Sequence, residues 1–521
     1  MRLFNTLSRR DEEFAPSREN TVRMYTCGLT VYARGHVGNF RTFVVLDVLR
    51  RALKYQAGFA VRQVMNFTDV DDRTILEAQK AGVPLRQYTD QYIEAFRKDA
   101  AALGLEPPEE TPRATDDSNI AAMGQTIAAL ERNGHTYRTD GSIYFKIESF
   151  PEYGKLARLD HGGIKSGARI DADKYDKENA RDFVLWKATR PGEPTWDPGI
   201  GPGRPGWHIE CSAMALRLLG EPPIDLHAGG VDLVFPHHEN EIAQSEGATG
   251  KPFARFWVHV EHLIIDEDDR GPEKMSKSLG NVYNLQDIVD HGFRPSTLRY
   301  LYLGVHYRKQ LKFSWTAMQQ AEEALKRLTD FLARLDSLPA VEGSDGGQTG
   351  VRPQPLSPGA TGPQPLSGGS GSDGGQTGVR PQPLSPGAAG SGPGPRLEEA
   401  RRQFSEHIAA DINTAAAIGV MFDLVRALNS AIDAGDVRAE DAQAIRETFA
   451  QFDRVLGFLA LRRAEDERPP VPVEEIEQLM QARRAARLAR NFAEADRIRA
   501  DLDARGIVLE DTGSSTRWKT K

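Results

Sequence analysis

The sequence predicts an α/β protein. A Rossmann-type parallel-sheet domain carries an insertion, and an α-helical region and a small C-terminal unit follow it. Residues 22–27 and 61–67 have the composition of short buried strands, and residues 40–55 between them place apolar side chains at helical spacing. A strand, a helix and a second strand in this order form a βαβ unit, which implies a parallel sheet. Strand-like segments return at 224–227 and 257–260, where we expect the second half of the sheet.

The turn between the first strand and the helix contains His36-Val37-Gly38-Asn39. This segment falls near the N-terminus of the predicted helix, where unpaired backbone N–H groups and the helix dipole favour phosphate. The apolar face of the helix anchors the turn on the sheet and consists of Phe43, Leu46, Val48, Leu49 and Leu53.

We assign the first domain to residues 1–315 and divide it where strand-like and helical sequence patterns begin and end. Its two Rossmann-type halves cover about 20–115 and 205–265, and an insertion at about 116–204 separates them. Residues 266–315 form a loop region that completes the domain.

Helical spacing continues at 316–340 and resumes at 397–462, and prolines near residue 470 precede a last unit at 470–521. Between the two helical stretches, 26 of the 56 residues of 341–396 are glycine or proline, a composition that cannot support a packed core. An 18-residue segment that begins at Gly343 recurs unchanged from Gly371. We interpret 341–396 as a low-complexity linker.

The composition indicates an ordinary cytoplasmic protein. At 521 residues the chain has room for about three domains. Two cysteines argue against a disulfide framework and for a reducing compartment. No apolar run approaches the ~20 residues that span a bilayer, so we expect no membrane association. The net charge of −8 gives no overall support for nucleic-acid binding, although residues 480–521 carry ten Lys or Arg against six Asp or Glu.

Both cysteines lie in segments suited to holding a metal. Cys27 follows the first predicted strand, Cys211 lies in Gly206–Met214, and Phe235–Glu241 offers imidazole and carboxylate ligands. Thiolate, imidazole and carboxylate together suit zinc better than magnesium or calcium. Ligands this far apart require a large fold to gather them, which predicts a site that acts on a substrate.

A second strong motif is Lys274-Met275-Ser276-Lys277-Ser278. Together with the His36–Asn39 turn, it resembles the two signatures of the class I aminoacyl-tRNA synthetases. Longer segments are similar to the cysteinyl-tRNA synthetases within that class, and the resemblance covers nearly the whole chain outside 341–396. These segments are Cys27–Tyr32, Trp207–Met214, His227–Asp232 and Phe235–Glu241.

The resemblance implies a cysteine–tRNA ligase activity. ATP, with Mg²⁺, would activate L-cysteine as cysteinyl-adenylate, which is then transferred to the 3′ end of tRNA-Cys. The catalytic residues carried over are His36, Asn39, Lys274 and Lys277, of which His36, Asn39 and Lys277 would bind ATP. The first signature ends in Asn39 rather than histidine, and an amide can donate a hydrogen bond but cannot act as an acid or base, so we expect Asn39 only to position the phosphates.

The resemblance also implies one zinc ion per chain, with Cys27, Cys211, His237 and Glu241 as ligands. A soft thiolate on zinc would distinguish cysteine from serine far better than pocket shape alone. Four protein ligands are typical of structural zinc, so the substrate must add a fifth ligand or displace Glu241. If residues 237–241 are helical, His237 and Glu241 share one face, and His238 is turned away from the ligands.

The resemblance also implies which residues bind cysteine and which regions bind tRNA. Substrate-binding residues would be Gly28, Thr68, Trp207, His227 and Asp232, with Asp232 facing the ammonium group. The 397–462 and 470–521 regions would bind tRNA. Arg517 and Trp518 are candidates to contact phosphate and an unpaired base, although a buried role for Trp518 is equally open. We expect a monomer.

Two other functions fit parts of the chain. Ligases that join cysteine to the amine of a small sugar resemble the catalytic half, but they lack a C-terminal tRNA-binding unit. A non-catalytic zinc and RNA-binding module descended from a synthetase would not need the intact Lys274–Ser278 motif.

Overall fold

The structure is a computed structural model. The residues that it describes are 1–159, 182–266, 282–338, 392–467, 471–512 and 515–520. The Lys274–Ser278 motif and all of the predicted linker before residue 392 lie outside these ranges.

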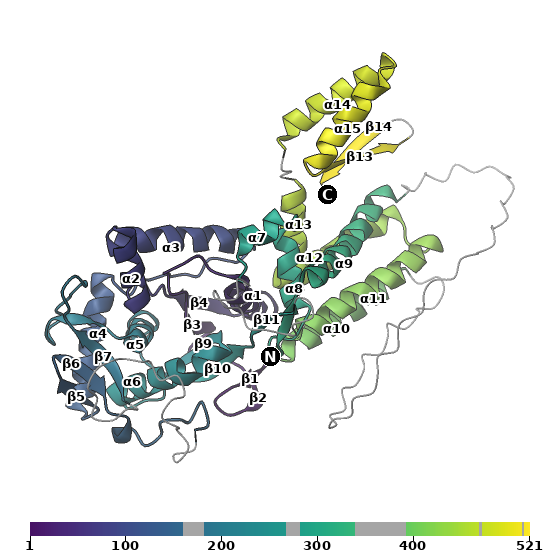
Figure 1. The fold of residues 1–521 in the computed structure, drawn as a ribbon. Helices are drawn as coiled ribbons and strands as arrows, with labels where there is room; N and C mark the ends of the chain where they lie inside the picture. The colour runs from purple at the N-terminus through teal and green to yellow at the C-terminus, as the bar shows by residue number, and fades with distance from the viewer. Residues whose placement is uncertain (160–181, 267–281, 339–391, 468–470, 513–514, 521) are drawn as a thin grey trace.

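A four-stranded parallel sheet lies at the centre of the first domain (Figure 1). Its strands, in spatial order, are β10 (Ala254–Val260), β9 (Ile224–Gly230), β3 (Thr21–Thr26) and β4 (Ala60–Met65). The two halves of the sheet join where β3 pairs with β9, which sets Tyr25 opposite His227. The predicted α/β class with a parallel sheet is therefore confirmed.

Helix α1 (Val37–Arg51) provides the crossover from β3 to β4. Its buried residues include Phe43, Leu46, Val48 and Leu49, because the apolar spacing directs this face onto the sheet. A single π-helical turn, Ala52–Gln56, follows it. The helix thus holds the His36 turn at the carboxyl edge of β3, where parallel α/β sheets bind their ligands.

The chain between β4 and β9 adds, in its described residues, a second, antiparallel sheet and four α-helices. Its antiparallel sheet consists of β5 (Thr136–Thr139), β6 (Ser142–Phe145), β7 (Phe183–Ala188) and β8 (Gly203–Pro205). Helices before and after it are α2 (Asp72–Ala81), α3 (Leu85–Ala102), α4 (Asp117–Arg132) and α5 (Trp207–Leu219). Its core cluster includes Cys27 and Cys211, so the insertion packs against the predicted metal site.

Short elements complete the first domain. A hairpin of β1 (Arg2–Asn5) and β2 (Arg10–Glu13) lies beside β10, and α6 (Glu239–Thr249) connects β9 to β10. Two single turns, Val231–Leu233 and Val234–His238, precede α6. Beyond β10 come β11 (Leu263–Ile265), α7 (Leu285–Asp290), α8 (Pro295–Leu303) and β12 (Leu311–Phe313).

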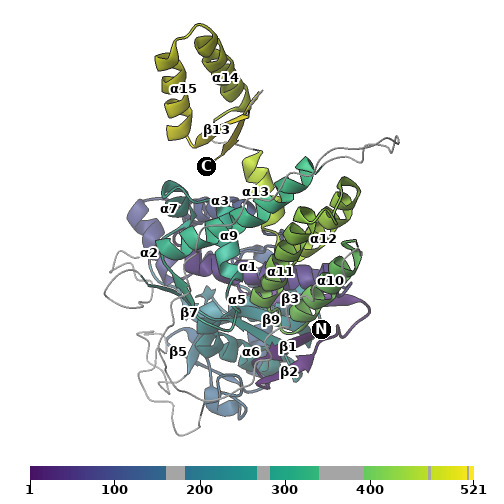
Figure 2. The ribbon, with the colours of Figure 1, turned by 90° about the vertical axis from the view of Figure 1, so that its right-hand side faces the viewer.

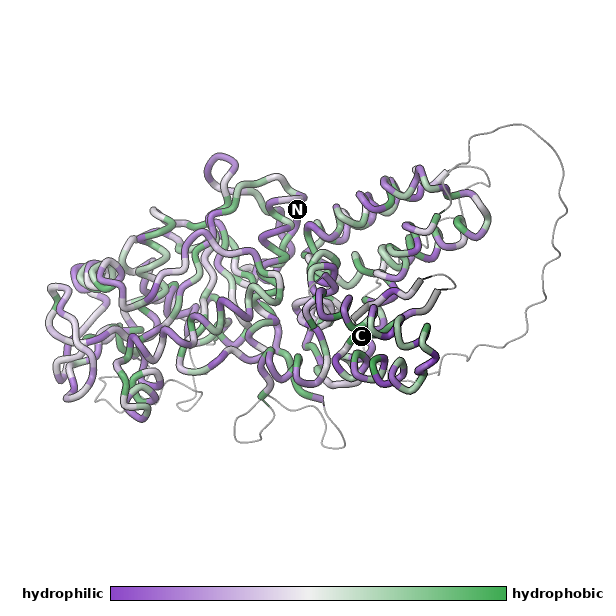
Figure 3. The backbone as a smooth tube through the Cα atoms, turned by 90° about the horizontal axis from the view of Figure 1, so that it is seen from above, coloured by the Kyte–Doolittle hydropathy of each residue, from purple (hydrophilic) through white to green (hydrophobic). Residues whose placement is uncertain are grey.

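Long helices follow the first domain and share its main hydrophobic core. They are α9 (Trp315–Arg334), α10 (Gly394–Ala409), α11 (Thr414–Asp433), α12 (Ala442–Leu456) and α13 (Leu459–Asp466). Along these helices the backbone alternates between hydrophilic and hydrophobic residues (Figure 3), as amphipathic helices do. Of the described helices, α11 alone has the length and hydropathy of a membrane span, but its apolar residues lie in the shared core.

The C-terminal unit is a small body with its own core and projects from α13 (Figures 1 and 2). It contains α14 (Val473–Leu488) and α15 (Phe492–Ala504), followed by the antiparallel strands β13 (Ile507–Thr512) and β14 (Ser515–Thr520). Asn491 is the N-cap of α15, where its side-chain oxygen accepts a hydrogen bond from the Glu494 N–H.

Candidate active site

A pocket of about 320 Å³ opens at the carboxyl edge of the central sheet. Its walls come from the turn after β3, the N-terminus of α5, the turn after β9 and the segment after β10. Of the predicted site residues, the pocket is lined by Cys27, Gly28, His36, Asn39, Trp207 and Asp232. Segments separated by about two hundred positions in the sequence thus meet in one pocket.

His36 and Asn39 form a capping box at the start of α1. The Asn39 backbone N–H donates to His36 Nδ1 at 3.2 Å, and the His36 backbone N–H donates to Asn39 Oδ1 at 3.1 Å. Because Nδ1 accepts a hydrogen bond, the neutral imidazole carries its proton on Nε2. Because Asn39 is held through its oxygen, its amide N–H groups stay available as donors. Both side chains are thereby positioned as donors beside a helix N-terminus.

Behind the pocket floor, four potential ligand atoms converge. The ligand atoms of Cys27, Cys211, His237 and Glu241 all lie within 4.8 Å of one another, and the four residues are buried. The two sulfurs are 3.8 Å apart. Two thiolates bound to one tetrahedral zinc at 2.3 Å would lie about 3.8 Å apart.

The orientation of His237 also suits a ligand. Its Nδ1 lies 2.9 Å from Nδ1 of His208, which fixes the ring, and its Nε2 lies 3.0 Å from Glu241 Oε1. The Nε2 atom is buried and makes no hydrogen bond of acceptable geometry in the described structure. A buried imidazole nitrogen that faces two sulfurs and a carboxylate fits a zinc ion well.

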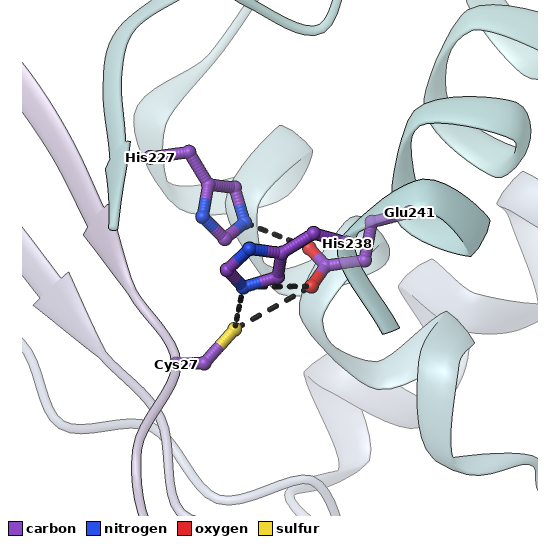
Figure 4. A group of neighbouring side chains, drawn as sticks. All are labelled: Cys27, His227, His238 and Glu241. Atoms are coloured by element: carbon purple, nitrogen blue, oxygen red, sulfur yellow. Dashed lines mark hydrogen bonds and ion pairs between the residues drawn. The ribbon is translucent and has the colours of Figure 1, made fainter. Parts of the chain in front are cut away.

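A second group of ligand atoms overlaps the first and consists of Cys27, His227, His238 and Glu241 (Figure 4). His238 Nε2 lies 3.4 Å from Cys27 Sγ, and His227 Nε2 lies 2.9 Å from Glu241 Oε2. The prediction that His238 turns away is wrong. His237 and Glu241 do contact each other at i and i+4, as predicted for a helix, but His238 and Glu241 lie at i and i+3, which also brings their side chains together. We favour the first group because it alone uses both thiols.

The cluster favours the ionised form of three of its groups. Burial opposes ionisation of Cys211, but the hydrogen bond from Cys27 and the charge of His237 outweigh it and lower the pKa to about 6. Burial also opposes the Glu241 carboxylate, yet His227 and His237 lower its pKa to about 2. For His237, the Cys211 and Glu241 charges overcome burial and raise the pKa to about 10. Burial raises the pKa of Cys27, so metal binding must release protons from Cys27 and His237.

The predicted substrate residues divide into two sets. Gly28, Trp207 and Asp232 line the pocket, and the Trp207 ring stacks on His237 with centroids 4.2 Å apart. Thr68 and His227 are buried outside the pocket lining. His227 Nε2 contacts the second oxygen of Glu241 and its ring stacks on Trp257, so His227 lies against the group of potential ligands on the side away from the pocket.

Asn66 is a site residue that the sequence did not single out. Its Oδ1 accepts a hydrogen bond from the Gly28 N–H at 3.1 Å and lies 3.7 Å from Cys211 Sγ, while its Nδ2 lies 3.4 Å from the Thr68 hydroxyl. A Cβ on Gly28 would lie 1.6 Å from the Asn66 carbonyl oxygen, so only glycine fits there. Asn66 therefore connects the Cys27 turn to α5.

Lys274 and Lys277 lie outside the described residues, but the segments on either side of them border the pocket. Leu263 and Val282 line it, and the Val37 N–H donates to the Tyr283 carbonyl at 2.8 Å. The chain therefore leaves and re-enters the described structure beside the start of α1.

In the C-terminal unit, Trp518 is half-buried against the small core, and Arg517 is exposed. The most exposed large apolar side chains lie instead at the hairpin between α14 and α15, where Leu488 is 80% and Phe492 is 61% exposed. The basic residues Arg487 and Arg490 lie in the same hairpin. The sequence analysis did not identify this second surface. The signal for it would have been Phe492, an aromatic residue directly after the N-cap of a helix.

Comparisons with known families agree with this organisation. The model of the tRNA synthetases class I (C) catalytic domain matches residues 13–323. A DALR domain model matches residues 403–460, and the cysteinyl-tRNA ligase anticodon binding domain matches residues 471–518.

Among relatives, the chain is 46% identical over 521 residues to a Cysteine--tRNA ligase of Solibacter usitatus, with 100% of both chains covered. It is 41% identical over 547 residues to that of Koribacter versatilis, again over 100% of both. Among solved structures, Mycobacterium tuberculosis methionyl-tRNA synthetase with methionyl-adenylate is 15% identical, with 84% of this chain and 88% of that chain covered and a TM-score of 0.52. At that identity the likeness shows a shared fold. The chain belongs to the cysteine–tRNA ligase family of class I aminoacyl-tRNA synthetases.

Proposed function

We propose that the protein activates L-cysteine with ATP to form cysteinyl-adenylate and transfers the cysteinyl group to the 3′ end of tRNA-Cys. The observation that carries this proposal is the pocket itself. It combines a helix N-terminus suited to phosphate with a buried cluster of two thiols, an imidazole and a carboxylate, which reaches the pocket at Cys27.

This cluster supports selection of the substrate by its sulfur. Cys27, Cys211, His237 and Glu241 would hold one zinc ion, which when bound supplies a soft Lewis acid that accepts a thiolate far more readily than a serine hydroxyl. His227 would orient Glu241 through its 2.9 Å contact, and Asn66 would hold the Cys27 turn. Trp207, stacked on His237, would cover the side chain of the amino acid.

Asp232, at the pocket wall, would pair with the substrate ammonium, while Gly28 allows close backbone approach. Thr68 would act through Asn66 rather than by touching the amino acid, because it lies outside the lining. This arrangement would leave the substrate carboxylate free to attack the α-phosphorus.

Activation requires in-line attack of that carboxylate on ATP, with pyrophosphate leaving. His36 and Asn39 would donate hydrogen bonds to the phosphates from their capping positions. Lys274 and Lys277 would stabilise the charge that develops on the leaving group, and Mg²⁺ would accompany ATP.

The direct test is charging of total tRNA with labelled cysteine in the presence of ATP, magnesium and zinc. We expect acid-precipitable label on a single tRNA species and no label from serine. Adenylate formation without tRNA charging would instead indicate ligation to a small molecule. Absence of both reactions would indicate a non-catalytic binding protein.

For tRNA, we expect Phe492 to stack on an unpaired base, because an exposed aromatic ring among arginines is suited to that contact. Replacing Phe492 with alanine should raise the KM for tRNA by roughly 5- to 150-fold, the equivalent of about 1–3 kcal/mol for one stacked base. Cysteine-dependent ATP–pyrophosphate exchange should not change.

Two variants serve as controls for this measurement. Phe492→Trp keeps an aromatic surface and should charge tRNA normally. Leu76→Ala removes an exposed apolar side chain from the first domain and should have no effect. An unchanged KM for tRNA in Phe492→Ala would contradict the assignment.

A further inference from the structure

We propose that Arg34 binds the β- and γ-phosphates of ATP and that Asp99 positions it. The inference rests on the proposed function and adds a binding residue that lies outside both signature motifs. Arg34 lines the same pocket as His36 and Asn39.

The geometry of Arg34 is that of an anchored guanidinium. Its Nε donates to Asp99 Oδ2 at 2.8 Å and its Nη2 donates to Asp99 Oδ1 at 2.6 Å, a bidentate pair. The Asp99 side chain, on α3, is 4% exposed, whereas that of Arg34 is 35% exposed. This pairing uses one edge of the guanidinium and leaves Nη1 with no partner among the described residues. A rigid fork with one free edge loses little entropy when it binds an anion.

The charged residues that line the pocket indicate what the unpaired edge of Arg34 binds. Among the described residues that line the pocket, Arg34 is the single lysine or arginine, and Asp232 and Glu261 are both acidic. A triphosphate carries several negative charges, so its binding here requires cations. Asp99 offsets part of the positive charge of Arg34 but leaves N–H donors for phosphate oxygens.

The position of Arg34 indicates that it contacts the β- and γ-phosphates of ATP rather than the α-phosphate. Arg34 is held by α3 and lies within electrostatic range of Asp287 and Asp290 on α7. Figures 1 and 2 place α3 and α7 together at one side of the sheet, and α6, which carries Glu241, at the other. The amino acid would therefore lie toward α6. In-line attack drives pyrophosphate away from the amino acid, toward α3 and Arg34.

The test is cysteine-dependent ATP–pyrophosphate exchange with Arg34→Gln. We expect the KM for ATP and the KM for pyrophosphate each to rise about 10- to 100-fold, as for loss of a charged hydrogen bond. The KM for cysteine and the inhibition constant of AMP should not change, because neither ligand carries β- or γ-phosphates. Arg34→Lys, which keeps the charge but loses the fork, should give intermediate values.

Asp99→Asn tests positioning. It should raise the KM for ATP without changing the KM for cysteine, and it should add nothing when Arg34 is already glutamine. The matched control is Arg73→Gln, which removes an exposed arginine that stacks on Tyr32 near the pocket, and all constants should be kept.

Four outcomes would overturn this proposal, and a fifth would refute the proposed function on which it rests. An unchanged KM for ATP and pyrophosphate in a folded Arg34→Gln would overturn it. So would equal weakening of ATP and AMP, which would show general damage to the pocket, or a raised KM for tRNA alone, which would assign Arg34 to the tRNA 3′ end. If Arg34→Gln does not fold, normal KM values in Arg34→Lys would overturn it equally. Failure of wild-type exchange would instead refute the proposed function.

Discussion

Replacing Cys211 with serine is expected to remove bound zinc and to lower cysteine activation by about 100-fold or more. Loss of a residue that merely supports a metal ligand costs about 10- to 100-fold, and loss of a ligand should exceed that. The pKa of the Cys211 thiol is lowered to about 6, so Cys211 is ionised at neutral pH and can bind a metal as a thiolate. A serine hydroxyl at this position would not ionise. Preference for cysteine over serine should fall together with the zinc content.

The measurement is zinc content by elemental analysis, alongside exchange kinetics with cysteine and with serine. His238→Gln is the matched control, because the two overlapping ligand groups differ in these residues. We expect His238→Gln to retain zinc. If His238→Gln lost zinc and Cys211→Ser kept it, the ligands would be Cys27, His227, His238 and Glu241. Selectivity retained in a folded, metal-free Cys211→Ser would refute discrimination by zinc.

Replacing Arg299 with methionine is expected to lower the free energy of unfolding by about 3–5 kcal/mol. Arg299, on α8, is fully buried, and its Nη2 donates to Asp47 of α1 at 2.5 Å. Its other N–H groups donate to the carbonyls of Leu456, Leu103 and Gly104. Removal leaves a buried carboxylate and several buried carbonyls with fewer partners, which is the costly way to break a buried ion pair.

This effect is measured as the first transition in urea at fixed protein concentration. Arg463→Met is the control, because Arg463 is exposed and its pair with Glu467 contributes at most about 0.5 kcal/mol. Arg299 joins α1, whose N-cap is His36, to α12 of the helical region. A loss below about 1 kcal/mol would show that this junction does not depend on the ion pair.

The sequence by itself determined the parallel sheet and the family, and its resemblance to that family gave the four predicted zinc ligands. Periodic apolar residues specify strands and helices locally, and two cysteines in a chain of this length leave few choices for thiolate ligands. The position of the His36 turn at a helix N-terminus could also be predicted, because a helix N-terminus is a local feature.

Only the tertiary structure decided how residues distant in the chain share the site. It placed Thr68 and His227 behind the lining, brought His238 to Cys27, and joined Arg34 to Asp99. It also exposed Phe492 and half-buried Trp518. These facts depend on packing between elements, which residue spacing within one segment does not specify.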